Sequence, residues 1–320
     1  MATISICATV KNEADTVRAL ISDLKSQTLR PDEIVVVDGG STDGTPEQLT
    51  AGLAEWAAFK LIDFAGSNIA RGRNRAVAGS SGDLIALVDA GLRLRPEWLE
   101  SLARPLQSDP SVEVVFGYVL SKPSNFFETV LGAVTIPTES EIDPVTYPPS
   151  AGSLAFRREF VEHCNFPEWL DFGEDMYLNL KWRGERRRLK HAAGADVGFR
   201  PRRNLQGFFR QYFNYARGDG QGGMRWSRHL FRYSSYAAGV WLGILAPNHR
   251  LALLVLTVAG SVYLRRPYRR LVGLIPSMSP HRALAAVVLV PAIRAVGDAA
   301  KMLGFLVGLG EAKTDRLPPR

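Results

Sequence analysis

Two aspartates stand directly after apolar runs that are typical of buried strands. Asp38 follows the run EIVVV at 33–37, and Asp89 follows LIALV at 84–88. Because ligands bind beyond the carboxyl ends of strands in an open α/β sheet, we expect both carboxylates at a binding edge. A carboxylate there can accept hydrogen bonds from a nucleobase or a sugar hydroxyl, or bind a divalent metal through oxygen. The nearby Asp43-Gly44 pair is good turn chemistry and needs no functional explanation.

Several common kinds of site lack their sequence signatures. No Gly-x-Gly-x-x-Gly follows the first expected strand, and no Gly-x-x-x-x-Gly-Lys-Ser/Thr loop occurs, which argues against dinucleotide enzymes and P-loop NTPases. The five histidines are scattered without zinc-ligand spacing. A Gly-x-Ser-x-Gly elbow for serine catalysis is absent as well.

The elements that must position the aspartates alternate along the chain. Apolar runs predict strands at 3–9, 33–37, 60–64 and 84–88, and the intervening patterns predict helices at 12–26, 46–57 and 69–78. Short apolar strands alternating with helices indicate an α/β fold with a mostly parallel sheet covered on both faces. A strand at 153–156 and a helix at 173–183 follow further along.

The pattern fails between residues 121 and 150, where five prolines occur. We expect a long loop there, with room for one short helix. Long loops in compact domains are often lids or binding segments, and a variable surface insertion is an equal alternative.

The charge is unevenly distributed along the 320 residues. The chain carries a net charge of +7, with 46% hydrophobic and 22% charged residues, which excludes a disordered or collagen-like protein. Residues 225–320 hold 14 Lys and Arg against three acids, a net +11, so the first 224 residues are slightly acidic at −4. Two cysteines cannot form a disulfide framework, which favours a reducing compartment. The positive charge therefore belongs mainly to the C-terminal region.

The C-terminal region is also apolar. The runs 236–245 and 251–264 are each shorter than the roughly 20 residues that span a bilayer. The stretch 283–309 is long enough, but it contains Arg294, Asp298 and Lys301, which are costly at a bilayer centre. We therefore expect helices lying in the headgroup region of an anionic membrane surface, with arginines on lipid phosphates at 265, 266, 269 and 270. A soluble helical subdomain is the alternative. The first residues lack the features of a signal peptide, so we expect the cytoplasmic face of the membrane.

An ordered set of motifs now points to a known family. The blocks are TVKNEA at 9–14, VVVDGGSTDGT at 35–45, ARGRNRA at 70–76, GDLIALVDAG at 82–91, FGEDM at 172–176 and FFRQYFNYARGDG at 208–220. Together they resemble the family 2 glycosyltransferases with the GT-A fold. The resemblance covers roughly the first two thirds of the chain and implies a catalytic domain at 1–224. The apolar, basic pattern that follows predicts a helical membrane-association region at 225–320.

The resemblance implies a donor site at the first strand ends. In such enzymes these strand ends hold the nucleotide of an activated sugar, which places Thr9, Glu13 and Asp38 around base and ribose. Arg73 and Asn74 match the family's Arg-Asn pair near the donor pocket. A second arginine, Arg71, adds charge towards the diphosphate.

The resemblance also implies the reacting groups. Asp89 matches the first acid of the family's Asp-x-Asp, which holds Mg²⁺ or Mn²⁺ against the diphosphate of the leaving group. Glu174 and Asp175 match the Glu-Asp pair that opens a helix beneath the acceptor, with Asp175 as general base in an inverting transfer. From the residues alone, a helix N-terminal carboxylate stabilised by the helix dipole is the favoured interpretation of Asp175, and the other matching blocks favour the base.

Some positions depart from the family pattern. Gly91 replaces the second acid of Asp-x-Asp. Either Asp89 suffices with diphosphate oxygens and water, or another acid helps, or metal dependence is weak. The Gln-x-x-Arg-Trp signature of processive synthases is absent, which favours addition of a single sugar. We expect Gln211 and Arg217 beside the acceptor or the diphosphate, with a solvated basic helix as the alternative. The basic cluster at 183–203 has too few aromatics for a nucleic-acid platform and is expected to face anionic lipid or a phosphate-bearing acceptor.

The combined expectation is a membrane-associated glycosyltransferase. It would move one sugar from a UDP- or GDP-linked donor to a lipid-linked or other membrane-located acceptor, with inversion. A non-catalytic nucleotide-sugar-binding or scaffold protein is the main alternative, and Gly91 is the residue in its favour. A nucleotidyltransferase is disfavoured because no glycine-rich, basic phosphate loop follows the first strand.

Overall fold

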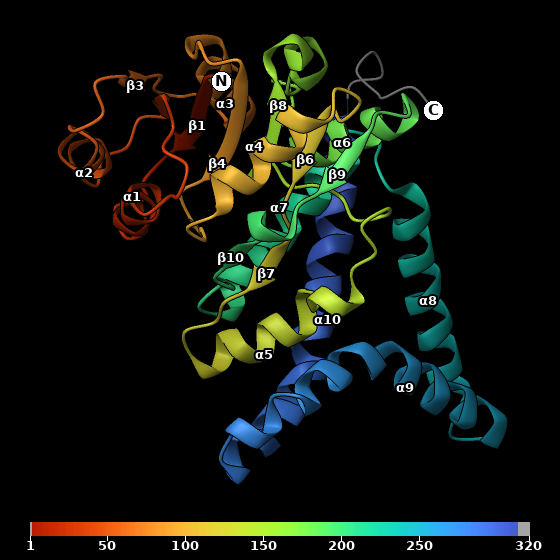
Figure 1. Cartoon of the computed structure of the whole chain (residues 1–320). Coiled ribbons are helices and arrows are strands. Elements are labelled where there is room, and N and C mark those ends of the chain that lie inside the picture. Colours follow the sequence, from red (N-terminus) through yellow and green to blue (C-terminus); the bar gives the residue numbers. More distant parts are fainter. Residues whose placement is uncertain (1, 313–320) are drawn as a thin grey trace. The chain divides into compact units, whose positions relative to one another are not determined.

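The computed structural model describes residues 2–312 and groups the chain into two compact units. The first unit comprises residues 1–120 and 139–200, and the second comprises residues 121–138 and 201–320. Each unit is described separately below (Figure 1).

A seven-stranded sheet forms the centre of the first unit, in the order β3-β2-β1-β4-β8-β6-β9. Its strands are β1 (Ile4–Val10), β2 (Glu33–Asp38), β3 (Phe59–Asp63), β4 (Leu84–Asp89), β6 (Val114–Phe116), β8 (Ser153–Arg157) and β9 (Leu189–His191). The first four are parallel to one another, and β8 runs antiparallel to both β4 and β6. The mixed α/β fold with a mostly parallel sheet is confirmed. A second, three-stranded sheet has the order β5-β10-β7 and consists of β5 (Leu92–Arg93), β7 (Val119–Ser121) and β10 (Val197–Phe199).

Helices cover both faces of the large sheet. They are α1 (Val17–Lys25), α2 (Thr45–Gly52), α3 (Ile69–Gly79), α4 (Trp98–Ser108) and α6 (Glu174–Gly184), with short 3₁₀ turns at Glu139–Glu141, Arg158–Cys164 and Ala193–Ala195. Alternation within each strand explains the two faces, because successive side chains of a strand point to opposite sides. In β2, Ile34 and Val36 join the apolar cluster of α1, α2 and α4, whereas Val35 and Val37 join the cluster of α3 and α6.

The first helix begins five residues later than the sequence pattern predicts. Asn12 has a left-handed backbone with φ of 54°, so residues 12–16 form a loop instead of a first helical turn. This loop bonds to the loop after β2: the Asn12 amide donates to Ser41 Oγ, and the Thr42 amide donates to Asn12 Oδ1. Tertiary hydrogen bonds between two strand-end loops therefore override local helix periodicity here.

The second unit is helical over its described residues. It contains α5 (Phe126–Thr135), α7 (Leu205–Gln221), α8 (Trp226–Leu245), α9 (Arg250–Val272), a 3₁₀ turn at Ile275–Ser277 and α10 (Pro280–Glu311). The expected long loop at 121–150 thus contains a ten-residue helix, α5. The unit boundary falls after Arg200, so α7 groups with the C-terminal helices. Whether 225–320 acts as a membrane-association region stays a prediction.

Glycines let α7 and α10 approach closely. A Cβ placed on Gly304 would lie 2.1 Å from the Phe213 carbonyl oxygen, and one on Gly308 would lie 2.0 Å from that of Arg217. Only glycine fits at these two positions of α10.

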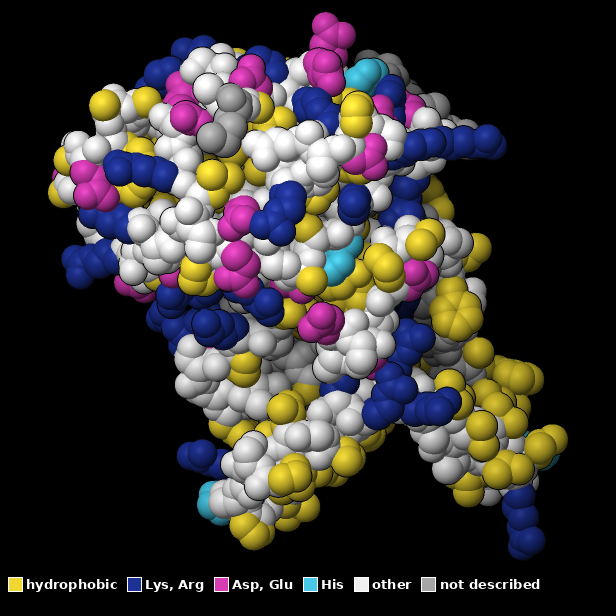
Figure 2. Space-filling view, viewed as in Figure 1, with side chains coloured by type: hydrophobic (Ala, Val, Ile, Leu, Met, Phe, Trp, Pro, Cys, Tyr) yellow, Lys and Arg dark blue, Asp and Glu magenta, His cyan; other side chains and the backbone are white. Residues whose placement is uncertain are grey.

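Apolar side chains remain exposed on α8 and α9. Phe231 and Trp241 of α8 are 75% and 63% exposed, and Leu251 of α9 is 72% exposed. Figure 2 shows hydrophobic side chains gathered over these helices. Within the described chain, α10 is the one helix long and apolar enough to cross a bilayer, a test that the core helix of a soluble protein also passes.

Candidate active site

Arg73 joins the two groups of carboxylates predicted to act in the reaction. Its guanidinium lies on α3 and is buried, with Nη2 donating to Asp89 Oδ1 at 2.7 Å and Nη1 donating to Glu174 Oε1. Asp89 ends β4, and Glu174 begins α6, so residues from three elements meet at one side chain. About a third of the Asp89 side chain, 35%, stays exposed.

The helix that carries Arg73 is held in place at its start. The Asn68 side chain caps α3 by accepting a hydrogen bond from the Arg71 amide. One turn later Gly72 packs against β1, where a Cβ would lie 2.4 Å from Thr9 Oγ1. The absence of a side chain at Gly72 therefore sets how closely α3, and Arg73 with it, approaches the strand ends.

The electrostatics at Arg73 are those of a buried cation among carboxylates. Burial alone would lower the pKa of Arg73, but the charges of Asp89, Glu174 and Asp175 raise it above its usual value. Burial raises the pKa of Glu174, which the charge of Arg73 opposes. The guanidinium thus stays charged and holds Asp89 and Glu174 in fixed positions.

Asp175 occupies the first turn of α6, next to Glu174. Gly173 caps this helix with a left-handed φ of 79°, and the half-buried Asp175 accepts a hydrogen bond through Oδ1 from the Met176 amide at 2.7 Å. Its charge acts on Arg73 and also on Tyr147. The predicted base therefore lies within electrostatic range of the same guanidinium that holds Asp89.

The strand register brings the donor-site candidates to one sheet edge. Thr9 pairs with Asp89 across β1 and β4, and Val10 pairs with Asp38 across β1 and β2. Asp38 is buried and accepts hydrogen bonds from the amide and hydroxyl of Ser41. Its carboxylate oxygens therefore help to hold the loop after β2. Glu13 is tied to that loop through its amide, which donates to Thr45 Oγ1.

Asn74 and Arg71 contact a different segment. The Asn74 side chain donates to the Phe166 carbonyl and accepts from the Phe166 amide, both at 2.9 Å. Arg71 is exposed, lies over the Phe64 ring and has its Nε 3.8 Å from a Glu168 carboxylate oxygen. Asn74 therefore holds the segment that precedes α6, whereas Arg71 keeps an exposed cation near the edge of the site.

Gln211 and Arg217 belong to the second unit, on α7. Gln211 Nε2 donates to the Tyr215 hydroxyl at 2.8 Å, and Arg217 Nε donates to Glu311 at 2.6 Å. Asp219, in the same motif, is buried and accepts from Arg225 and His229. The contact of Gln211 lies within α7 and that of Arg217 joins α7 to α10, and the proximity of both residues to an acceptor stays a prediction.

The surroundings of Asp89 fit a metal that the protein holds through one carboxylate. Within residues 2–312 no group of three His, Cys, Asp or Glu side chains is arranged to hold a metal ion. A Cβ on Gly91 would meet nothing within 4 Å, so the position of the missing second acid is open space. Mg²⁺ is commonly bound by one or two carboxylates with water and substrate phosphates as its other ligands. Asp89 with a diphosphate satisfies that pattern.

Sequence reasoning missed an aromatic group in the first unit. The rings of Tyr118 and His191 stack at 3.6 Å, and Tyr147 meets Tyr118 edge-on at 4.8 Å. The buried Asp196 accepts from the Tyr118 amide and lies 2.8 Å from His191 Nε2. Burial, and then the charges of Asp196 and Asp175, raise the pKa of Tyr147 to about 12. His191 ends β9, Tyr118 lies between β6 and β7, and Tyr147 and Asp196 lie in loops, so no local motif could have revealed the group.

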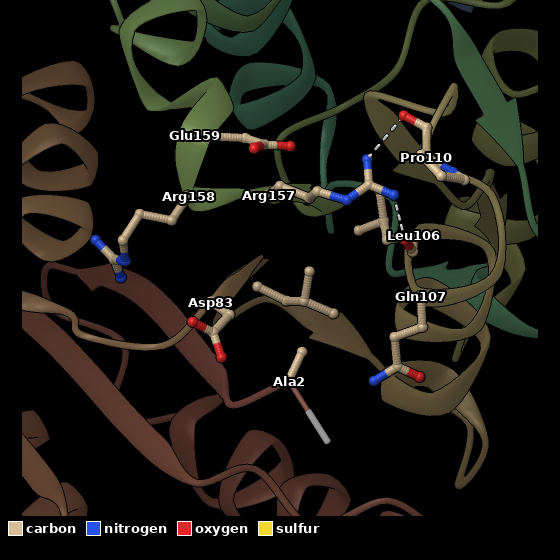
Figure 3. A pocket seen from close by; sticks show the side chains of 9 residues that line it. Ala2, Asp83, Leu106, Gln107, Pro110, Arg157, Arg158 and Glu159 are labelled. Carbon is tan, nitrogen blue, oxygen red and sulfur yellow. Dashed lines mark hydrogen bonds between the residues drawn. The ribbon is translucent and has the colours of Figure 1, made fainter.

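A hollow of about 720 Å³ lies at the other edge of the sheet, where β1 and β4 begin (Figure 3). Two arginines line it, but both are already bonded by the protein. Arg157 donates to the Val112 carbonyl, and Arg158 donates to the Gly82 carbonyl. The two arginines of this hollow therefore serve the fold through backbone carbonyls.

The comparisons with known proteins agree with this fold. A mannosyltransferase from Pyrobaculum calidifontis has a similar structure, with 18% identity and a TM-score of 0.51 over 97% of this chain and 86% of that one. The fold is thus that of the GT-A glycosyltransferases. Residues 5–163 match the family described as Glycosyl transferase family 2, and the chain belongs to that family through this segment.

Curated relatives match over shorter stretches. A TPR repeat-containing protein of Synechococcus elongatus is 36% identical over 103 residues, which is 31% of this chain and 23% of that protein. The putative glycosyltransferase EpsH of Bacillus subtilis is 26% identical over 101 residues, 32% of this chain and 29% of EpsH. A cholesterol galactosyltransferase of Borreliella burgdorferi is 25% identical over 108 residues, 34% of this chain and 30% of that enzyme. The matched segments span less than a third of these relatives.

Proposed function

We propose that this glycosyltransferase moves a single sugar from a UDP- or GDP-linked donor to the hydroxyl of a lipid-linked or other membrane-located acceptor, with inversion. The observation that carries the proposal is the buried Arg73, which fixes Asp89 and Glu174 and lies within electrostatic range of Asp175. A carboxylate able to face a metal and a base, both acting electrostatically on one guanidinium, suit transfer between a diphosphate and a hydroxyl.

In this proposal Asp175 accepts the proton of the acceptor hydroxyl as that oxygen attacks the sugar. Its position in the first turn of α6 and its bond from the Met176 amide orient the carboxylate. Arg73 and Glu174 act as positioning residues, because both are buried in a mutual ion pair. Thr9, Glu13 and Asp38 line the nucleotide side of the edge, and Arg71 and Asn74 flank the diphosphate side.

Asp89 would be the protein ligand of Mg²⁺ or Mn²⁺, an ion that stabilises charge on the departing nucleoside diphosphate. The mannosyltransferase of similar fold is in complex with GDP-Man and Mn²⁺, which is consistent with this donor and metal. Because Gly91 supplies no second acid, we expect a weaker metal requirement than in a two-acid site.

The membrane location rests on the second unit. Its helices α8 and α9 expose large apolar side chains and carry the arginines expected at lipid phosphates, at positions 265, 266, 269 and 270. A curated relative is named as a transferase to cholesterol, which is a membrane lipid acceptor. We therefore propose that residues 225–320 associate with the cytoplasmic face of a membrane.

The direct test is a panel of UDP- and GDP-sugars offered to the purified chain with and without Mn²⁺. We expect saturable binding of one donor and its slow hydrolysis in the absence of acceptor. Failure of every donor to bind or to be hydrolysed would contradict the proposal. Metal-independent donor binding without any turnover would favour the non-catalytic alternative.

A further inference from the structure

The second unit encloses a small cavity with an unusually cationic wall. Its volume is about 50 Å³, and its polar lining comes from Thr135 of α5, Tyr212 of α7 and the pair Arg294 and Lys301 of α10. Phe208 and Ile293 contribute apolar surface. Because one water needs roughly 10–15 Å³ of such a cavity, the space holds a few waters or, in their place, a single phosphate group.

The cations at this cavity outnumber the anions. Asp298 is the carboxylate that faces them, and it is shared among Arg232 Nε at 3.1 Å, Lys301 Nζ at 3.3 Å and the hydroxyl of Tyr263. Arg294 lies with its guanidinium over the Tyr263 ring, and its buried Nε has no hydrogen-bond acceptor. One carboxylate thus faces three cations.

The other described carboxylates of this unit are bonded elsewhere. Asp219 accepts from Arg225 and His229, Glu311 accepts from Arg217, and Glu128 accepts from the Ser124 amide. A further arginine, Arg270, donates to the Ala133 carbonyl beside the cavity residue Val134. Among the contacts given for the described residues, Asp298 is therefore the carboxylate that bonds to the cations around this cavity.

Partly buried cations that share one counterion are costly, and the buried Nε of Arg294, which is left without an acceptor, adds to that cost. A ligand that brings negative charge and several acceptor oxygens removes both costs. Arginine and lysine together are the usual partners of phosphate. Exposed apolar side chains on α8 and α9 of the same unit indicate that the source of the phosphate is a lipid rather than the aqueous phase.

We propose that the cavity formed by Arg294, Lys301, Tyr212 and Thr135 binds the phosphate group of a membrane lipid. This site rests on the proposed membrane-located acceptor and specifies its chemistry as an anionic phospholipid or lipid phosphate. From the sequence alone, the charges of Arg294 and Lys301 argue against a helix that spans a bilayer. In this proposal the same two charges bind the ligand.

The test uses short-chain soluble lipids, so that the charge of a membrane surface plays no part. Purified full chain in neutral detergent is titrated with dihexanoyl phosphatidic acid, dihexanoyl phosphatidylcholine or inorganic phosphate, with thermal unfolding and calorimetry as readouts. We expect phosphatidic acid to bind and to raise the unfolding temperature, phosphatidylcholine to do neither, and inorganic phosphate to bind far more weakly.

Variants distinguish binding in the cavity from nonspecific attraction of the anionic lipid to the basic surface. Arg294→Gln and Lys301→Gln are each expected to weaken phosphatidic acid binding about tenfold, because each removes a charge-assisted hydrogen bond. Arg282→Gln, on the exposed start of α10, is the matched control and is expected to bind as the wild type does. Without ligand, Arg294→Gln is expected to unfold at the wild-type temperature or above it, because it removes an uncompensated cation.

Three results would overturn the site. One is equal binding by Arg294→Gln, Lys301→Gln and wild type, and another is an equal loss in Arg282→Gln. The third is loss of folding in the unliganded Arg294→Gln and Lys301→Gln variants, which would indicate a purely structural role. Inorganic phosphate binding as tightly as phosphatidic acid would overturn the lipid source. Nucleotide-sugar binding is measured in a separate experiment. A failure of the proposed donor binding can therefore be told apart from a failure of the lipid-phosphate site.

Discussion

Nη2 of Arg73 lies 2.7 Å from Oδ1 of Asp89, so the carboxylate predicted to face the metal is already held by a buried cation of the same chain. The same guanidinium bonds Glu174 on its other side. This arrangement makes the position of Asp89 depend on α3 and α6 as much as on its own strand.

Replacing Arg73 should therefore damage both stability and activity. In Arg73→Gln the buried Glu174 loses its charge partner, and breaking such a pair costs about 3 kcal/mol. We expect chemical denaturation to show this loss and donor turnover to disappear. Arg75→Gln, exposed on the same helix, is the control and should change neither quantity. Unchanged stability in Arg73→Gln would mean that the ion pair does not organise the site.

Asp175→Asn should abolish transfer and preserve donor binding. Removing a general base costs on the order of 10²–10⁴ in rate, while the amide keeps the shape and the hydrogen bond from Met176. Transfer rate and donor affinity should be measured together. Asp171→Asn, an exposed aspartate of the preceding loop, is the matched control. Persistent transfer in Asp175→Asn would show that another group accepts the proton.

Gly91→Asp should strengthen the dependence on metal. The position has open space around it, so the new carboxylate fits and adds a second oxygen ligand near Asp89. We expect the Mn²⁺ concentration at half-maximal donor binding to fall several-fold, and Gly91→Asn to have a smaller effect. If the aspartate leaves the metal response unchanged, Asp89 is not at the metal.

Glu33 should make the fold sensitive to acid. Burial alone would raise its pKa, but hydrogen bonds from Lys60, Ser5 and the Ser81 amide lower it to about 2 from an ordinary 4.5. A carboxyl whose pKa is lower in the folded than in the unfolded protein stabilises the fold. This stabilisation is complete above the pKa of the unfolded state and is lost as the pH falls through the pKa of the folded state. Glu33→Gln should therefore be less stable by about 2 kcal/mol at neutral pH and about equal to wild type near pH 2.

Urea denaturation at several pH values tests this prediction, with Glu47→Gln, exposed on α2, as its control. A stability difference that does not change between pH 7 and pH 2 would assign the effect to packing instead of charge.

The sequence by itself determined the α/β class, the parallel strands and the edge that carries Asp38 and Asp89. These follow from local information, because apolar runs of strand length and the residue after each run are visible in the chain. Strand register then placed Thr9 and Asp89 side by side, as parallel neighbours at one sheet edge must lie.

Only the tertiary structure decided which charges meet. Arg73 is 16 residues from Asp89 and 101 from Glu174, and no local pattern shows that one guanidinium bonds both. The same holds for Arg294 and Lys301, whose place in a cavity depends on α5, α7 and α10 packing together. The energy of a buried charge depends on its partners, because burial removes the solvent that would otherwise screen it. Those partners come from distant parts of the chain.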